Sequence, residues 1–231
     1  MSAPEPGSAS DPVATCPARG TVHFSPTGFD GALTGDADHL ELTDGRRVRI
    51  AVRRWHGAAD HGDRRLLDCC HGPAIDLGCG PGRLVHTLAA RGLAALGVDM
   101  SPWAVRYCQA RGAPVLQRDV FGPLPGAGFW RHVLLADGNI GLGGDPVTLL
   151  RRSAALLRPT GTVVVEIAPT DNGLWRGAAR VGSSPKSGGW FPWAIVGLDA
   201  LATVANTAGL RLRGSHRYQQ RHFAELDREC R

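Results

Sequence analysis

The clearest alternation of apolar and polar positions lies in residues 73–91. A short apolar run ends in three glycines at alternate positions, Gly78, Gly80 and Gly82. Apolar residues then recur at helical spacing: Leu84, Val85, Leu88 and Ala89. This pattern predicts a buried strand over 73–77, a tight turn and a helix over 82–91. Glycine is required in such a turn where the backbone takes positive φ, or where a ligand approaches it closely.

Short apolar runs and amphipathic stretches continue to alternate along the rest of the chain. They predict further strands at 94–99, 114–118, 132–136, 161–167, 210–218 and 220–227. They predict further helices at 102–111, 146–157 and 197–208. Regular alternation of this kind is typical of an α/β fold with a doubly wound, mostly parallel sheet.

The chain before residue 73 is less regular. Residues 1–20 are rich in Pro, Ser and Ala, and we interpret them as a disordered arm. Residues 21–72 form an N-terminal cap segment in our interpretation: 21–50 predict either a small hairpin or a cap over the core, and 53–71 contain a short helix. The main domain is then 73–231.

Three carboxylates follow the first three predicted strands of this domain or lie within them. Asp76 precedes the first glycine, Asp99 ends the second strand, and Asp119 follows the third. The glycine turn and the free N–H groups of the next helix suit a nucleotide-type cofactor. Asp99 suits a ribose diol, Asp119 an adenine amino group, and Asp76 a cationic amino-acid end.

A dinucleotide is the alternative cofactor. Its fingerprint requires a small residue at the sixth place, where this chain has Arg83. An acid at Asp76 also offers nothing to a pyrophosphate, and the chain has no Tyr-x-x-x-Lys pair for hydride chemistry. The residues therefore argue against a nicotinamide-dependent oxidoreductase.

The motifs Asp-Leu-Gly-Cys-Gly-Pro-Gly, Gly-Val-Asp-Met-Ser and Arg-Asp-Val occur in this order, and from about Trp55 onward the chain resembles class I S-adenosylmethionine-dependent methyltransferases. The resemblance implies a Rossmann-like, seven-stranded, mostly parallel sheet with an antiparallel C-terminal strand. It implies S-adenosyl-L-methionine as the cofactor. The cofactor-binding set carried over is Asp76, Gly78, Cys79, Gly80, Gly82, Asp99, Met100, Asp119 and Val120.

The catalytic candidates are Asp137 and His56. Asp137 follows the fourth strand, whose end lies near the reacting methyl group in the resembling family. It could hold the cofactor's amino group, orient the acceptor or take its proton, or simply cap a glycine-rich turn. His56 has the neutral pKa that suits a base, and it precedes the first strand, where the family often covers the cofactor.

The predicted acceptor-binding residues are Asn139, Glu166, Trp190 and Trp193. The last two lie in an insert, 168–196, that supplies the acceptor wall in folds of this kind. Gly182 and the stretch 183–189 offer little apolar surface, so we expect 175–193 to be mobile without ligand. The segment after Asp137 lacks the Asn/Asp-Pro-Pro-Tyr/Phe element of amide and base-nitrogen methyltransferases, which leaves hydroxyl, amine, carboxyl or carbon acceptors open.

Composition narrows the class of partner. The net charge is +5, but Lys186 is the only lysine and the arginines are scattered, which argues against nucleic acid as a partner. No apolar run approaches membrane-spanning length. The six cysteines show neither metal spacing nor a disulfide framework, and we expect no metal and a cytoplasmic location.

The sequence therefore predicts methyl transfer to a small-molecule acceptor, and it leaves the oligomeric state open. The alternatives are an RNA methyltransferase and a non-catalytic relative that binds the cofactor.

Overall fold

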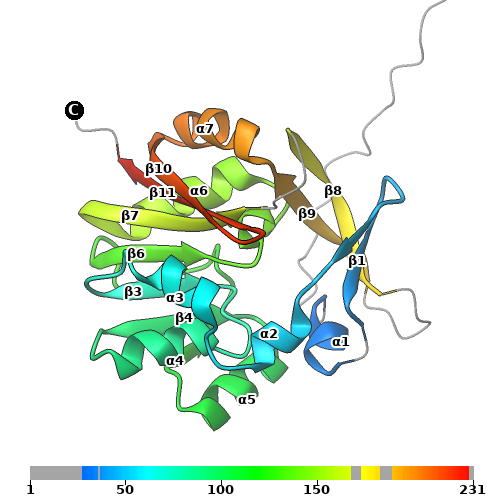
Figure 1. Ribbon diagram of the computed structural model, residues 1–231, viewed down its shortest axis with the longest axis horizontal. Coiled ribbons are helices and arrows are strands. Elements are labelled where there is room, and N and C mark those ends of the chain that lie inside the picture. The colour runs from blue at the N-terminus through cyan, green and yellow to red at the C-terminus, as the bar shows by residue number, and fades with distance from the viewer. Residues whose placement is uncertain (1–27, 36, 168–172, 183–188, 229–231) are drawn as a thin grey trace, which may run out of the picture.

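The computed structural model describes residues 28–35, 37–167, 173–182 and 189–228. Its larger sheet has seven strands in the order β10-β11-β7-β6-β3-β4-β5 (Figure 1). These strands are β3 (Ala74–Leu77), β4 (Ala95–Asp99), β5 (Val115–Gln117), β6 (Trp130–Leu135), β7 (Leu157–Ile167), β10 (Leu210–Tyr218) and β11 (Arg221–Arg228). Strands β3 to β7 are parallel, and β11 is antiparallel to both of its neighbours. The predicted fold class is confirmed.

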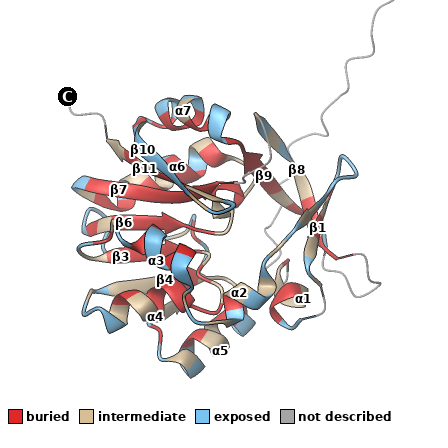
Figure 2. Ribbon diagram, in the orientation of Figure 1, coloured by how far each residue is buried: buried red, intermediate tan, exposed pale blue. Residues whose placement is uncertain are grey.

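Helices form two groups about this sheet. One consists of α3 (His61–Leu67), α4 (Arg83–Ala90) and α5 (Pro102–Arg111), and the other of α6 (Pro146–Leu156) and α7 (Leu198–Thr207). Helix α4 buries the predicted stripe of Leu84, Val85 and Leu88. Helix α5 starts where the sequence predicts, since the Ser101 hydroxyl accepts the main-chain N–H of Ala104. The central strands between the two groups are buried (Figure 2).

A second sheet stands beside the first, and the sequence did not predict it. Its four strands, in the order β2-β1-β8-β9, are β1 (His39–Leu42), β2 (Arg47–Arg49), β8 (Leu174–Val181) and β9 (Phe191–Val196). The hairpin predicted within 21–50 is present as β1 and β2, but β1 also pairs with β8 of the insert. Short helices α1 (Asp30–Leu33) and α2 (Val52–His56) flank this sheet along the chain.

The insert differs from the expectation of a mobile segment. Its described parts are the paired strands β8 and β9, and Phe191 and Trp193 on β9 are buried. Phe29 packs against both rings, with centroids 5.1 and 5.4 Å away. This aromatic packing supplies the apolar surface that the glycine–serine stretch lacks. Residues 1–20 and 183–188, on which the predicted arm and part of the insert fall, lie outside the described residues.

Candidate functional site

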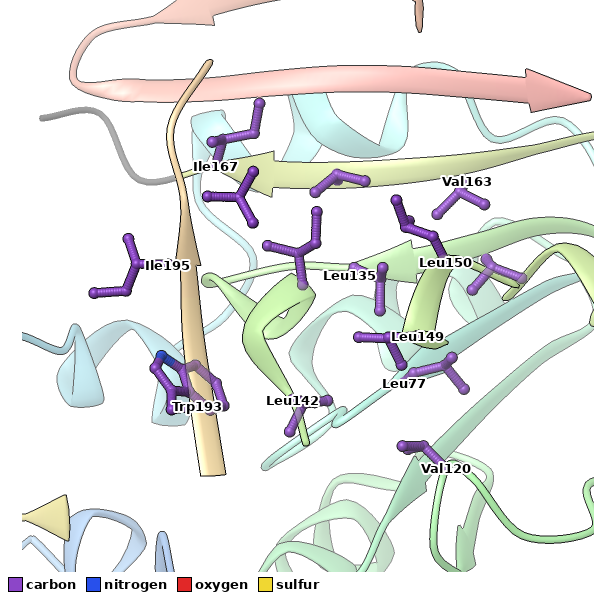
Figure 3. Packing of buried hydrophobic residues seen from close by; sticks show 14 of the residues in the cluster. Leu77, Val120, Leu135, Leu142, Leu149, Leu150, Val163, Ile167, Trp193 and Ile195 are labelled. Carbon is purple, nitrogen blue, oxygen red and sulfur yellow. The ribbon is translucent and has the colours of Figure 1, made fainter. Parts of the chain in front are cut away.

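A cavity of about 370 Å³ lies between the carboxyl ends of the parallel strands and the second sheet. One part of its lining comes from the loops after β3, β4 and β5: Gly78, Cys79, Gly80, Asp99, Met100, Asp119 and Val120. Another part is apolar: Phe29, Leu33, Leu40, Val48, Ile50, Trp55, Trp193 and Ile195. Figure 3 shows Trp193 and Ile195 on β9, beside Ile167 at the end of β7. Seven of the nine predicted cofactor-binding residues thus line one cavity.

The glycine turn has the backbone geometry that its sequence predicts. Gly78, Gly80 and Gly82 have φ of 76°, 52° and 77°, the left-handed region that disfavours other residues. At Gly78 a Cβ would meet the Asn139 amide nitrogen at 2.7 Å. At Gly80 it would meet nothing within 4 Å, and this glycine faces the cavity. The turn therefore leaves space for a ligand at its centre.

The carboxylate of Asp99 organises the same turn. Its two oxygens accept the main-chain N–H groups of Gly80 and Ser101, both at 2.9 Å. Burial raises the pKa of Asp99, although these hydrogen bonds act against that shift. Asp119 lies on the same cavity, where one of its oxygens accepts the N–H of Phe121 at 2.9 Å. Both acids are placed to accept hydrogen bonds from a polar ligand.

Asp76 lies behind the turn and does not line the cavity. It is buried, and its Oδ1 atom has no hydrogen-bond partner among the described residues. Burial raises its pKa to about 7, and the nearby carboxylates of Asp137 and Asp99 add to this shift. An unsatisfied buried acid beside a ligand-sized opening fits a cationic ligand. This observation agrees with a donor that carries a sulfonium and an ammonium group.

Six charged side chains form a closed ring at the base of the cavity. Arg83 donates to both oxygens of Asp63 at 2.8 and 2.9 Å, and to Asp137 at 2.8 Å. Arg54 contacts Asp137 and lies 3.5 Å from Glu166. Arg221 then joins Glu166 back to Asp63, at 2.7 and 2.9 Å. The ring alternates in sign, and it connects α2, α3 and α4 to the ends of β6, β7 and β11.

The ring decides the chemistry of Asp137. Burial alone would raise the pKa of this carboxyl, but Arg83 and Arg54 more than offset burial and lower the pKa to about 2. A carboxylate held by two guanidinium groups is a weak proton acceptor at neutral pH. Of the roles predicted for Asp137, accepting a proton is therefore disfavoured, and orienting neighbouring groups is favoured.

Asn139 and Glu166, two of the predicted acceptor-binding residues, line the cavity but are also engaged in the protein. The Asn139 amide donates to the carbonyls of Leu77 and Gly78 at 3.0 and 2.8 Å. Glu166 accepts the main-chain N–H of Asp137 at 3.0 Å and pairs with Arg221. Their side chains hold the site together from within.

His56, Trp190 and Gly82 lie outside the cavity lining. His56 is exposed on α2 and packs edge-on against Tyr107 with ring centroids 4.8 Å apart, so its selection as a base needs correction. Trp190 is 44% exposed and lies under the Arg180 guanidinium at 4.8 Å, so it does not form the predicted wall. Trp193, 5% exposed, does line the cavity. Gly82 lies behind the turn, against Cys108.

Sequence reasoning did not identify Arg54, Arg221 or Asp63 as site residues. Arg83 entered only as a departure from the dinucleotide fingerprint. One available signal was the capping pair Asp60 and Asp63, because an N-terminal carboxylate that precedes the glycine turn can reach a neighbouring helix. Nothing in the sequence indicates which arginine it meets.

Comparison with known proteins places the chain among methyltransferases. Residues 74–161 match the family described as "Methyltransferase domain". A human relative, a lysine N-methyltransferase of ATP synthase, is 38% identical over 47 residues. That alignment covers 20% of this chain and 20% of the relative, so the chain matches only a fifth of the relative's length.

Solved structures share the fold over most of the chain. A SAM-dependent methyltransferase from Bacteroides fragilis, solved with S-adenosyl-L-homocysteine, has a TM-score of 0.71 at 19% identity and covers 89% of this chain and 94% of its own. The 1,6-didemethyltoxoflavin-N1-methyltransferase of Burkholderia thailandensis has a TM-score of 0.60 at 19% identity, covering 95% and 94%. The chain therefore contains a class I methyltransferase domain, the type that uses S-adenosylmethionine as its methyl donor.

Proposed function

We propose that this protein transfers a methyl group from S-adenosylmethionine to an apolar small molecule. The observation that carries the proposal is the two-part cavity. Its acidic, glycine-lined part suits the donor, and its apolar part, formed by the second sheet, suits the body of an acceptor. The Burkholderia enzyme also acts on a small molecule, as its name states.

The residues divide into three roles in this proposal. Gly80, Asp99 and Asp119 hold the donor, and the orphaned carboxyl of Asp76 contributes negative charge behind them. The donor supplies the reactive methyl group when it is bound. Trp193, Ile195 and their apolar neighbours exclude water and orient the acceptor. Alignment of the two reactants then supplies most of the rate, because in-line transfer depends strongly on geometry.

The cellular location and the class of partner belong to the same proposal. The cysteines that the structure describes, Cys69, Cys70, Cys79 and Cys108, are free thiols, which supports a reducing compartment such as the cytoplasm. Among the described residues no helix has both the length and the apolar character needed to cross a membrane. An apolar chamber favours a small molecule over RNA, whose backbone needs a basic groove.

A calorimetric titration tests the donor half of the proposal. S-adenosylmethionine and S-adenosyl-L-homocysteine should bind, and NAD should not. Asp99→Asn should weaken binding by roughly 1.5–3 kcal/mol, the scale of a charge-assisted hydrogen bond. Asp68→Asn, which changes an exposed carboxylate outside the cavity, should leave binding unchanged. Binding of NAD in place of the methyl donor would overturn the proposal.

Formation of S-adenosyl-L-homocysteine over an acceptor panel tests the other half. The panel contains apolar aromatic and aliphatic small molecules, a structured RNA and a lysine-containing peptide. Turnover confined to the RNA or to the peptide would reject the small-molecule acceptor. Donor binding without turnover of any member would favour the non-catalytic relative.

A further inference from the structure

The C-terminal hairpin holds a carboxylate at the end of β7. Arg221, the first residue of β11, donates to both oxygens of Glu166, from Nε to Oε1 at 2.7 Å and from Nη2 to Oε2 at 2.8 Å. Arg221 also donates to Asp63 on α3 at 2.9 Å. The guanidinium is therefore fixed from two sides, and it fixes the Glu166 carboxylate in turn.

Glu166 holds the turn that follows β6. Its Oε2 atom accepts the main-chain N–H of Asp137 at 3.0 Å. Asp137 has a φ of 54°, and Gly138 has a φ of 83°. A non-glycine residue keeps positive φ only where its surroundings enforce that conformation. The hydrogen bond to Glu166 is one such restraint, and the Arg83 contact to the Asp137 side chain is another.

The same turn directs Asn139 at the glycine loop. The Asn139 amide donates to the carbonyl of Gly78 at 2.8 Å and to that of Leu77 at 3.0 Å. These are the carbonyls on which the loop 78–82 turns away from β3. A chain of direct contacts thus runs from Arg221 through Glu166 and Asp137 to Asn139 and the loop.

We propose that Arg221 is a positioning residue for the donor-binding loop and acts on it through Glu166 and Asn139. This inference rests on the proposed function, because it requires the loop 78–82 to bind the donor. The competing explanation is direct contact, since Arg221 also lines the cavity. The two explanations differ in how the effects of two substitutions combine.

A double-mutant cycle on S-adenosyl-L-homocysteine affinity, measured by calorimetry without any acceptor, separates them. Arg221→Gln and Asn139→Ala should each weaken binding by about tenfold or more, the scale of one charge-assisted contact. If Arg221 acts through Asn139, the double variant should bind no more weakly than the weaker single variant. Effects that multiply would show direct contact and overturn the proposal, as would unchanged affinity in Arg221→Gln.

Two further variants guard against loss of the fold. Arg211→Gln removes an ion pair to Asp227 on the same hairpin, outside the cavity, and should leave affinity unchanged. Arg221→Lys keeps the charge without the bidentate fork, and it replaces Arg221→Gln in the cycle if the latter does not fold. A wild-type protein that binds no S-adenosyl-L-homocysteine would instead reject the proposed function, and this inference with it.

Discussion

The side-chain amide of Asn139 occupies the place where any side chain on Gly78 would stand. A Cβ at residue 78 would lie 2.7 Å from Asn139 Nδ2, closer than real Cβ contacts come. Gly80, two residues later, has no protein atom within 4 Å of its Cβ position. The first glycine is therefore required by the protein, and the second by whatever fills the cavity.

Gly80→Ala should abolish donor binding with little loss of stability. An alanine in left-handed conformation costs about 1–2 kcal/mol, and its methyl group would occupy ligand space. Gly112→Ala is the matched control, because Gly112 has a φ of 74°, open space at its Cβ position and a place outside the cavity. Urea unfolding should give similar losses for both variants, and calorimetry should detect lost binding only in the first. Equal donor affinity in both variants would contradict this assignment.

Asp137→Asn should destabilise the protein by about 3–5 kcal/mol, because it leaves Arg83 and Arg54 with an uncompensated buried charge. Asp68→Asn breaks an exposed contact to Arg65 at 3.7 Å and should cost about 1 kcal/mol or less. Urea unfolding of the two variants measures the difference. A loss below about 1 kcal/mol for Asp137→Asn would mean that the ring is not a stabilising unit.

Asp76→Asn should change how stability depends on pH. The carboxyl pKa is about 7 in the folded protein and 3.8 for an ordinary aspartate, so the folded state binds the extra proton between these values. Stability from this group is fully present below pH 3.8 and lost as pH rises to 7, at up to about 1.4 kcal/mol per pH unit. The variant lacks that loss, so its stability relative to wild type should rise from about pH 4 to 7.

Subtraction of the wild-type curve isolates Asp76. Burial lowers the pKa of His132 to about 4, which gives the opposite slope over part of the same range. That contribution is common to both proteins and cancels in the difference. Parallel curves of unfolding free energy against pH for the two proteins would show that Asp76 is ionised throughout.

The two tryptophans of the insert should behave differently. Trp193→Ala should cost about 3–5 kcal/mol, because the ring is buried against Phe29 and Phe191. Trp190→Ala should cost about 1 kcal/mol or less, since it loses only an exposed contact to Arg180. Thermal unfolding of each single variant tests this, and equal shifts in melting temperature would refute it.

Local patterns in the sequence were sufficient for the larger sheet. The apolar run at 74–77, the glycines after it and the stripe on α4 lie within about twenty residues of one another, and each predicted its own element. The acids Asp99 and Asp119 could be assigned to a ligand because they follow parallel strands, whose carboxyl ends meet at one edge.

The second sheet and the ring depend on contacts between distant segments. Strand β2 has only three residues, none of them buried, and carries no strong local signal. The Arg221 contact to Asp63 spans 158 residues, and no local pattern distinguishes this arginine from the exposed ones. The placement of His56 failed for the same reason, because one turn of a short helix decides whether Arg54 or His56 faces the cavity.

The pairing of β1 with β8 has a consequence for how the cavity comes into being. Glu41 and Arg180, joined across these strands at 2.8 Å, are 139 residues apart in the chain. Closing so long a loop is entropically unfavourable until other contacts compensate it. We therefore expect the cavity wall to form after the parallel sheet during folding, and to open before it under mild denaturant. Amide hydrogens of β1 and β8 should accordingly exchange faster than those of β3 and β6.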